Sequence, residues 1–235
     1  MMKEIFEESY KKYLEFMTEN VDDYWQHLPF QGRRLQCESF IASINDKFNF
    51  EKLIVLETGV SHNPRDCVFG LFLGIAAAKT NGKMIAVDIQ NDLLLKSKSS
   101  FNTVIPELNY EVYNDDSVNF LSKLSEIPNL IHLDSWDLDL LHPLPSALHG
   151  WKEFLAIESK MPSGSIIAID DNYIAGTWVE WYYPDGHLEW LPINYPMIGK
   201  GSYIYQYVLS GSSDWNLIGD HYNVHNNIKI IIQKK

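Results

Sequence analysis

The sequence has few cysteines and few basic residues, and each scarcity excludes a class of protein. The two cysteines, Cys37 and Cys67, are too few for a disulfide framework, and their spacing matches no zinc motif. We therefore expect two free thiols in a reducing, cytoplasmic compartment. Lysine and arginine number 19 against 31 aspartates and glutamates, which gives a formal net charge of −12. Because such a field repels the phosphate backbone, we expect no nucleic-acid partner.

Long apolar runs are also missing. No segment approaches the ~20 consecutive apolar residues that span a bilayer, and residues 1–20 lack the apolar stretch of a signal peptide. We therefore expect no membrane partner. The hydrophobic fraction of 46% and the charged fraction of 21% are ordinary for a globular protein, which excludes a disordered chain. The length fits one large domain with a terminal elaboration.

Short apolar runs alternate with amphipathic segments along most of the chain. Helices are expected at 2–19 and 33–48, and we assign residues 1–49 to an N-terminal helical cap. Buried strands are expected at 52–58, 83–89, 110–113, 130–133 and 165–169. Helices are expected between them at 65–79, 91–101, 116–124 and 146–160. Two further strands, with hairpin-like spacing, are expected at 203–209 and 228–232.

This alternation predicts an α/β fold for residues 50–235, with a doubly wound, Rossmann-like sheet. The sheet is expected to be mostly parallel, with an antiparallel C-terminal strand. In such sheets ligands bind outside the carboxyl ends of the strands. Each of the five expected parallel strands delivers acidic residues to that edge: Glu57, Asp88, Asp115 with Asp116, Asp134, and Asp170 with Asp171.

Asp134, Asp170 and Asp171 follow two strands that we expect to be neighbours. Two carboxylates ~4 Å apart repel by about 4 kcal/mol at an effective dielectric constant of ~20. Lysine and arginine are scarce in these segments. A hard divalent cation such as Mg²⁺ would make the cluster tolerable. The alternative is that the carboxylates diverge into solvent.

Asp88 stands where a doubly wound fold holds the ribose hydroxyls of an adenosine cofactor, at the end of the second strand. The turn after the first strand lacks the Gly-x-Gly-x-x-Gly loop, because only Gly59 matches and Ser61 stands at a later glycine position. The missing glycines argue against an NAD-dependent oxidoreductase.

Three segments in this order resemble the cofactor-binding elements of class I S-adenosylmethionine-dependent methyltransferases: LETGVS at 56–61, AVDIQ at 86–90 and NDDSVNFL at 114–121. The resemblance covers roughly residues 50–235 and implies S-adenosylmethionine as the cofactor. The cofactor-binding residues that it implies are Glu57, Gly59, Ser61, Asp88, Gln90, Asp116, Ser117 and Asp134.

A narrower resemblance lies in HLDSWDLD at 132–139 and IAIDDN at 167–172, which are similar to metal-dependent O-methyltransferases of the catechol and macrocin-type sugar groups. It implies methylation of a small-molecule hydroxyl, with Mg²⁺ held by Asp134, Asp170 and Asp171. The base of the catechol group is a lysine at the position of Asp137, and the aspartate base of the sugar group lies at the position of Trp136. Asp137 is therefore our candidate base. His149 and His132 are weaker candidates, and His132 is expected to be structural because it lies in a buried strand.

Other interpretations stay open. The aromatic stretch 176–197 either walls an acceptor pocket or packs against the N-terminal helices or a subunit of a homo-oligomer. Asp137-Leu138-Asp139 matches the Asp-x-Asp motif of nucleotide-sugar glycosyltransferases. A non-catalytic binding protein of methyltransferase fold is a further alternative. Lys200 either neutralises part of the acidic site or is a solvated side chain, and we favour the solvated side chain.

Overall fold

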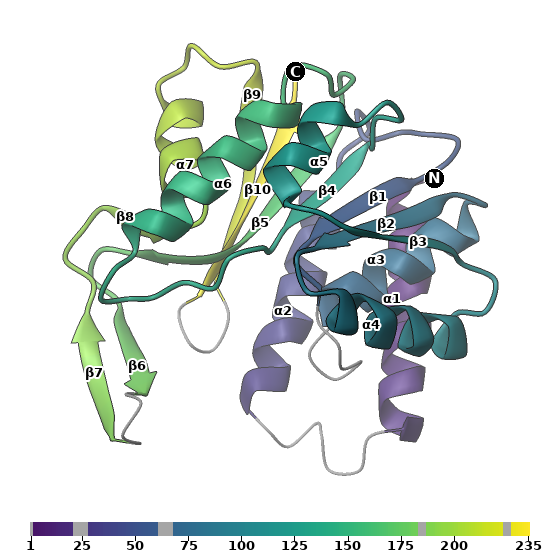
Figure 1. Cartoon of the computed structure of the whole chain (residues 1–235), viewed down its shortest axis with the longest axis horizontal. Coiled ribbons are helices and arrows are strands. Elements are labelled where there is room, and N and C mark those ends of the chain that lie inside the picture. The colour runs from purple at the N-terminus through teal and green to yellow at the C-terminus, as the bar shows by residue number, and fades with distance from the viewer. Residues whose placement is uncertain (1, 21–27, 61–67, 183–186, 223–226) are drawn as a thin grey trace.

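The computed structural model describes residues 2–20, 28–60, 68–182, 187–222 and 227–235 (Figure 1). The helices are α1 (Met2–Asn20), α2 (Leu28–Ser43), α3 (Val68–Lys79), α4 (Asn91–Val104), α5 (Ser117–Lys123), α6 (Leu144–Ile157) and α7 (Ser202–Leu209). The strands are β1 (Ile54–Thr58), β2 (Lys83–Asp88), β3 (Asn109–Asn114), β4 (Leu130–Leu133), β5 (Ile166–Ile174), β6 (Trp178–Tyr182), β7 (Leu188–Pro192), β8 (Met197–Gly199), β9 (Trp215–Tyr222) and β10 (Ile228–Lys234). None of the helices in these ranges is long and apolar enough to cross a membrane.

The main sheet has the strand order β3-β2-β1-β4-β5-β10-β9. Its first five strands are parallel, β10 runs antiparallel to both β5 and β9, and β8 pairs antiparallel with the extension of β5. The predicted α/β fold with a mostly parallel sheet and an antiparallel C-terminal strand is confirmed. The strand order reverses between β1 and β4, which is the place where open α/β sheets bind ligands.

Alternation along the buried strands explains the layers. Val55 of β1 packs on one face of the sheet and Leu56 on the other, and the strands beside them alternate in the same way. Helices α1 to α4 cover the first face, and α5 to α7 cover the second (Figure 1). Because helices cover both faces of the sheet, the sequences of the parallel strands are nearly continuous apolar runs.

The two N-terminal helices share the core of the first face. Phe6 of α1 and Phe40 of α2 have ring centroids 5.3 Å apart, and both contact Phe72 of α3. The helix predicted at 2–19 is thus present, whereas the one predicted at 33–48 begins earlier and ends at Ser43. It ends there because Asn45 closes a turn, with its side-chain oxygen accepting a hydrogen bond from the backbone N–H of Lys47 at 3.0 Å.

The strand predicted at 203–209 is wrong, because these residues form α7. Its tyrosines and β-branched residues favour a strand by composition, but Ile204 and Val208 are buried one helical turn apart. Asn172 fixes the start of the helix, since its side-chain oxygen accepts a hydrogen bond from the backbone N–H of Gly201 at 2.6 Å. The strand that pairs with β10 is β9 instead.

Candidate cofactor and acceptor site

The turn after β1 depends on a glycine. Gly59 has a φ of 73°, and a Cβ atom there would lie 2.5 Å from the backbone oxygen of Asp134. Its N–H donates to the carbonyl of Val87 at 2.9 Å. Only glycine therefore allows the ends of β1, β2 and β4 to approach one another this closely.

Asp88, at the end of β2, organises the two loops beside it. Its Oδ2 accepts a hydrogen bond from the N–H of Val60 at 3.0 Å, and its Oδ1 accepts one from the N–H of Gln90 at 2.7 Å. A carboxylate offers about four acceptor positions. Asp88 therefore keeps capacity for the hydroxyl groups of a ligand while its orientation is fixed.

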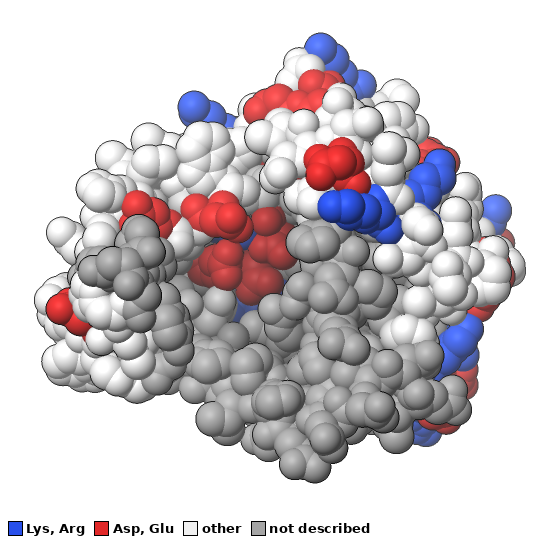
Figure 2. All heavy atoms as spheres, turned by 60° about the horizontal axis from the view of Figure 1, so that its bottom comes forward, with Lys and Arg blue, Asp and Glu red and all other residues white. Residues whose placement is uncertain are grey.

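A cavity of about 590 Å³ opens at this edge, beside the point where the strand order reverses. Six of the eight residues predicted to bind the cofactor line it: Gly59, Asp88, Gln90, Asp116, Ser117 and Asp134. Ser61 lies outside the described residues, and Glu57 lies beneath the cavity instead. Asp137 and His149, the two predicted catalytic residues, line the same cavity. Figure 2 shows the hollow in which Asp and Glu side chains gather on this face.

Glu57 is turned toward α3 and is buried. Its Oε1 lies 2.9 Å from Nδ1 of His132. A Cβ atom at position 70 would come within 2.7 Å of that oxygen, so Gly70 of α3 leaves the space that the carboxylate fills. Glu57 therefore belongs to a buried network rather than to the cavity lining.

Lys229 of β10 completes this network. Its Nζ lies 2.9 Å from Nε2 of His132 and 2.7 Å from Oδ2 of Asp170, and it stands over the ring of Phe69. Because an ammonium can only donate, Nε2 of His132 accepts and Nδ1 carries the proton donated to Glu57. Burial raises the pKa of Asp170, but the charge of Lys229, the contact with His132 and the charge of Lys200 together hold this pKa well below its ordinary value.

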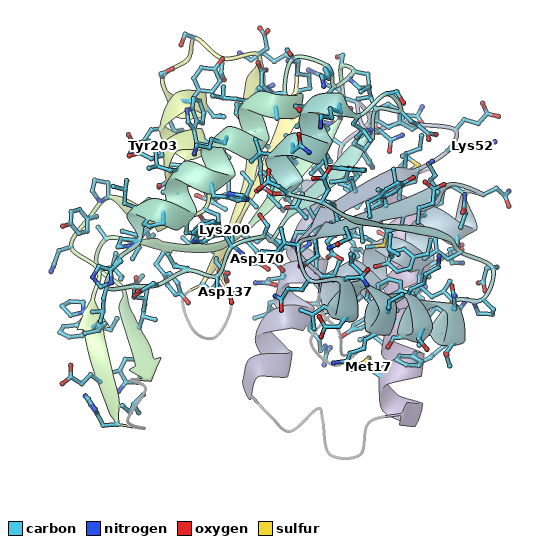
Figure 3. The ribbon with its side chains drawn as sticks, viewed as in Figure 1. Met17, Lys52, Asp137, Asp170, Lys200 and Tyr203 are labelled. Atoms are coloured by element: carbon cyan, nitrogen blue, oxygen red, sulfur yellow. The ribbon has the colours of Figure 1, made fainter. Side chains whose placement is uncertain are left out.

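Lys200, which follows β8, is buried between two carboxylates. Its side chain is 1% exposed, and Nζ lies 2.7 Å from Oδ1 of Asp134 and 2.9 Å from Oδ2 of Asp171. Burial alone would lower the pKa of Lys200, but the two carboxylates raise it above its ordinary value. The expectation of a solvated Lys200 is wrong. Figure 3 places Lys200, Asp170 and Asp137 together below α6.

These contacts test whether the acidic edge fits a divalent cation. His132, Asp134 and Asp170 each offer one atom within 4.8 Å of the others, which is a suitable spacing. Each of them is nevertheless in contact with an ammonium group, and both ring nitrogens of His132 are already hydrogen-bonded. Basic residues are scarce near these aspartates in the sequence, but Lys200 and Lys229 lie beside them in the folded chain. In this arrangement the residues do not fit a divalent cation.

His149 of α6 lies on the other side of the cavity. Its Nε2 is 3.0 Å from Oγ of Ser117 and 3.6 Å from Oε1 of Glu153, and its ring packs against Trp136. Glu153 is fully buried, and its Oε1 accepts a hydrogen bond from Ser135 at 2.7 Å. Its Oε2 has no hydrogen-bond partner in the described part of the chain. The hydrogen bond with Ser117 holds the imidazole at the cavity wall, and the buried carboxylate of Glu153 lies next to it.

The two aspartates of the Asp-x-Asp motif differ in their surroundings. Asp139 accepts hydrogen bonds from the N–H groups of Leu141 and His142, and its Oδ2 lies 3.0 Å from Nδ1 of His142. It therefore closes a turn, as aspartates commonly do. Asp137 is exposed at the rim of the cavity.

A second hollow, of about 660 Å³, is apolar. It lies between the β4–α6 loop, β7, β8 and α7, and none of the described residues that line it is charged. The aromatic stretch 176–197 contributes Leu191, Ile193 and Tyr195 to its wall. Within that stretch, β6 and β7 pair as a hairpin that extends from the body of the protein (Figure 1) and exposes Trp178 and Trp190.

Lys229 and Glu153 did not emerge from the sequence pattern, and Lys200 was expected to be solvated rather than buried. Each carries a signal in retrospect. Lys229 interrupts the apolar run of β10, Lys200 stands between two glycines, and Glu153 falls on the buried face of α6 with Gly150 and Phe154. A lone charge on an apolar face indicates a buried and paired group.

No protein-family model matches the sequence, and no curated protein matches it. Solved structures are similar in fold at low identity. An S-adenosylmethionine-dependent methyltransferase from Clostridium acetobutylicum is 13% identical with a TM-score of 0.51, over 96% of this chain and 98% of that one. The chain has a methyltransferase fold.

Two further structures agree. The glycopeptide N-methyltransferase MtfA in complex with S-adenosylmethionine is 7% identical with a TM-score of 0.51, over 87% of this chain and 95% of that one. SMU.1697c from Streptococcus mutans, in complex with SAH (S-adenosylhomocysteine), is 13% identical with a TM-score of 0.51, over 78% of this chain and 89% of that one. At these identities the likeness concerns the fold alone.

Proposed function

We propose that the protein is an S-adenosylmethionine-dependent methyltransferase. The observation that carries the proposal is the cavity at the reversal of the strand order, with Asp88 fixed by two backbone N–H groups and Gly59 opposite it. The carboxylate of Asp88 suits a ribose diol. Asp134 also lines the cavity, with its Oδ1 paired to Lys200.

We propose a small-molecule hydroxyl as the methyl acceptor. The apolar hollow, whose described lining carries no charge, could accommodate the uncharged part of such a molecule. The β4–α6 loop connects the two cavities, because it contributes Asp137 to the cofactor cavity and Leu140 to the apolar hollow. The net charge of −12 and the acidic edge disfavour a nucleic acid. A nitrogen acceptor, as in the glycopeptide N-methyltransferase MtfA, is an outcome that the acceptor assay distinguishes.

His149 is our preferred base. The acceptor hydroxyl would give its proton to Nδ1 of His149, its oxygen would bond to the methyl carbon, and the carbon–sulfur bond would break to leave S-adenosylhomocysteine. Contacts of Nε2 with Ser117 and Glu153 support this role, because they favour the tautomer that leaves Nδ1 as the acceptor. Asp137, at the rim, is the second candidate.

The metal-dependent form of the reaction has less support. Its predicted ligands Asp134, Asp170 and Asp171 lie close together, but Lys200 and Lys229 already contact them. We therefore favour methyl transfer without a divalent cation. The expected result is turnover that a chelator leaves unchanged.

Calorimetric titration tests the proposal against its rivals. We expect saturable binding of S-adenosylmethionine, and no binding of a UDP-sugar with or without Mn²⁺. A preference for the UDP-sugar would favour the glycosyltransferase. S-adenosylmethionine binding without methyl transfer to any hydroxyl or amine in an acceptor panel would favour the non-catalytic binding protein.

A further inference from the structure

The backbone around Lys200 is shaped to bury its ammonium group. Asp171 and Gly199 both have left-handed backbone conformations, with φ values of 52° and 116°. A Cβ atom at position 199 would lie 2.0 Å from the backbone oxygen of Asp171, and one at position 150 would lie 2.4 Å from that of Lys200. Two glycines and one strained aspartate therefore hold this segment against β5 and α6.

Each lysine of this edge bridges two polar groups from neighbouring strands. Lys200 links Asp134 to Asp171, and Lys229 links Asp170 to His132. Asn227 donates a further hydrogen bond to Oδ1 of Asp171 at 2.9 Å. Magnesium would need oxygen ligands at about 2.0–2.1 Å in octahedral geometry. The ammonium group of Lys200 stands where such an ion would have to bind these carboxylates.

We infer that Lys200 is the resident cation of the β4–β5 edge, that it keeps divalent ions off Asp134, Asp170 and Asp171, and that removing its side chain creates a divalent-cation site. The inference does not depend on the identity of the methyl donor, because it concerns charge balance at the edge. Three carboxylates, those of Asp134, Asp170 and Asp171, contact the two ammonium groups, and Glu57 joins them through His132. Loss of one ammonium group increases the excess of negative charge, which a divalent ion can offset.

Lys83 provides a matched control. Its Nζ also bridges two carboxylates, those of Glu111 and Glu126, and its side chain is 15% exposed. It stands at the start of β2, at the opposite end of the sheet, and the candidate metal group of the described residues includes neither Glu111 nor Glu126. Lys83→Ala therefore removes a paired lysine without opening a cluster of three ligands.

Binding of Mn²⁺, followed by water-proton relaxation in the full-length protein, tests the inference. The wild type and Lys83→Ala should show only weak, unsaturated Mn²⁺ binding. Lys200→Ala should show a saturable site whose affinity for Mn²⁺ is at least about tenfold higher than that weak binding. Adding Asp134→Asn to Lys200→Ala should remove that site. Mg²⁺ should also raise the unfolding temperature of Lys200→Ala and leave that of the wild type unchanged.

Two results would overturn the inference. One is saturable Mn²⁺ binding by the wild type that Asp134→Asn or Asp170→Asn weakens. The other is a folded Lys200→Ala protein with no gain in Mn²⁺ affinity. If Lys200→Ala does not fold, Lys200→Gln serves as the second variant, and the wild-type measurement decides by itself whether the edge excludes the ion.

Discussion

The carboxyl edge of the sheet has two halves that differ in the origin of their residues. In the cofactor half, Gly59, Asp88 and Asp116 each lie within two residues of the strand that places them. In the lysine half, Asp134 and Asp170 are neutralised by Lys200 and Lys229, which come from segments after β8 and in β10. Local sequence therefore specifies the first half, and long-range packing completes the second.

The difference also separates two ways of managing negative charge. The cofactor half leaves carboxylates beside an open cavity, where a ligand can reach them. The lysine half encloses its charges in ion pairs, which are costly to form and more costly to break one partner at a time. Substitutions of the charged or titratable side chains in the two halves should therefore affect different quantities: ligand affinity or turnover in the cofactor half, and stability in the lysine half.

The largest effect is expected at His149, in the cofactor half. His149→Gln should lower kcat by roughly 10²- to 10⁴-fold, because a positioned base contributes that much, while affinity for S-adenosylhomocysteine should change little. Steady-state kinetics and calorimetry measure the two quantities. Unchanged turnover in His149→Gln, together with a large loss in Asp137→Asn, would move the role of base to Asp137.

Breaking the lysine half should act on stability. Lys229→Met leaves the buried Asp170 unpaired and should lower the free energy of unfolding by about 3–5 kcal/mol, measured by urea denaturation. The double variant Lys229→Met/Asp170→Asn should recover part of that loss. Lys83→Met, at a more exposed pair, should cost about 1 kcal/mol or less. Equal losses in Lys229→Met and Lys83→Met would contradict the distinction between the halves.

Gly59 tests the local geometry of the cofactor half. Gly59→Ala should cost about 2–4 kcal/mol of unfolding free energy, because a left-handed φ is combined with a close approach to Asp134. Gly176 also has a left-handed φ, of 83°, but nothing lies within 4 Å of the position of its Cβ atom. Gly176→Ala should therefore cost only about 1–2 kcal/mol. Similar losses in the two variants would show that the close approach is unimportant.

The smallest effect is expected outside both halves, in the β6–β7 hairpin. Trp190 is 55% exposed, so Trp190→Ser should change the unfolding free energy by less than about 0.5 kcal/mol. Affinity for S-adenosylmethionine should also stay the same, as calorimetry can check. A marked loss of either quantity would show that the exposed face of the hairpin contacts the site or another subunit.

Much of the fold could be predicted because buried parallel strands have a distinctive pattern. β1, β2 and β4 lie where their apolar runs indicate, and the acidic residues at their ends mark the cavity. The pattern of the α7 segment predicts a strand, because its tyrosines and β-branched residues have strand propensity. The hydrogen bond from Gly201 to Asn172, which fixes the start of the helix, is long-range and leaves no local signal. The β6–β7 hairpin carries no clear period, so its pattern indicated neither helix nor strand.

The charge balance at the edge could not be predicted from local sequence. Repulsion among Asp134, Asp170 and Asp171 predicts a neighbouring cation, but it does not distinguish a metal ion from a lysine. Lys200 and Lys229 lie 66 and 59 residues beyond the carboxylates of Asp134 and Asp170 that they pair with. Only the topology, which places β10 beside β5 and β8 on its extension, brings them there.

Two aspartates near the end of β2 give the sharpest test of the proposed cofactor site. Asp88→Asn replaces the carboxylate that faces the cavity, and Asp92→Asn replaces an exposed carboxylate on α4 that does not line it. In calorimetric titrations, Asp88→Asn should weaken S-adenosylhomocysteine binding by roughly 10- to 100-fold, and Asp92→Asn should leave the affinity unchanged. The expected loss corresponds to the free energy of hydrogen bonds to a charged group. Equal affinity in wild type and Asp88→Asn, or no binding of the ligand by wild type, would contradict the proposed site.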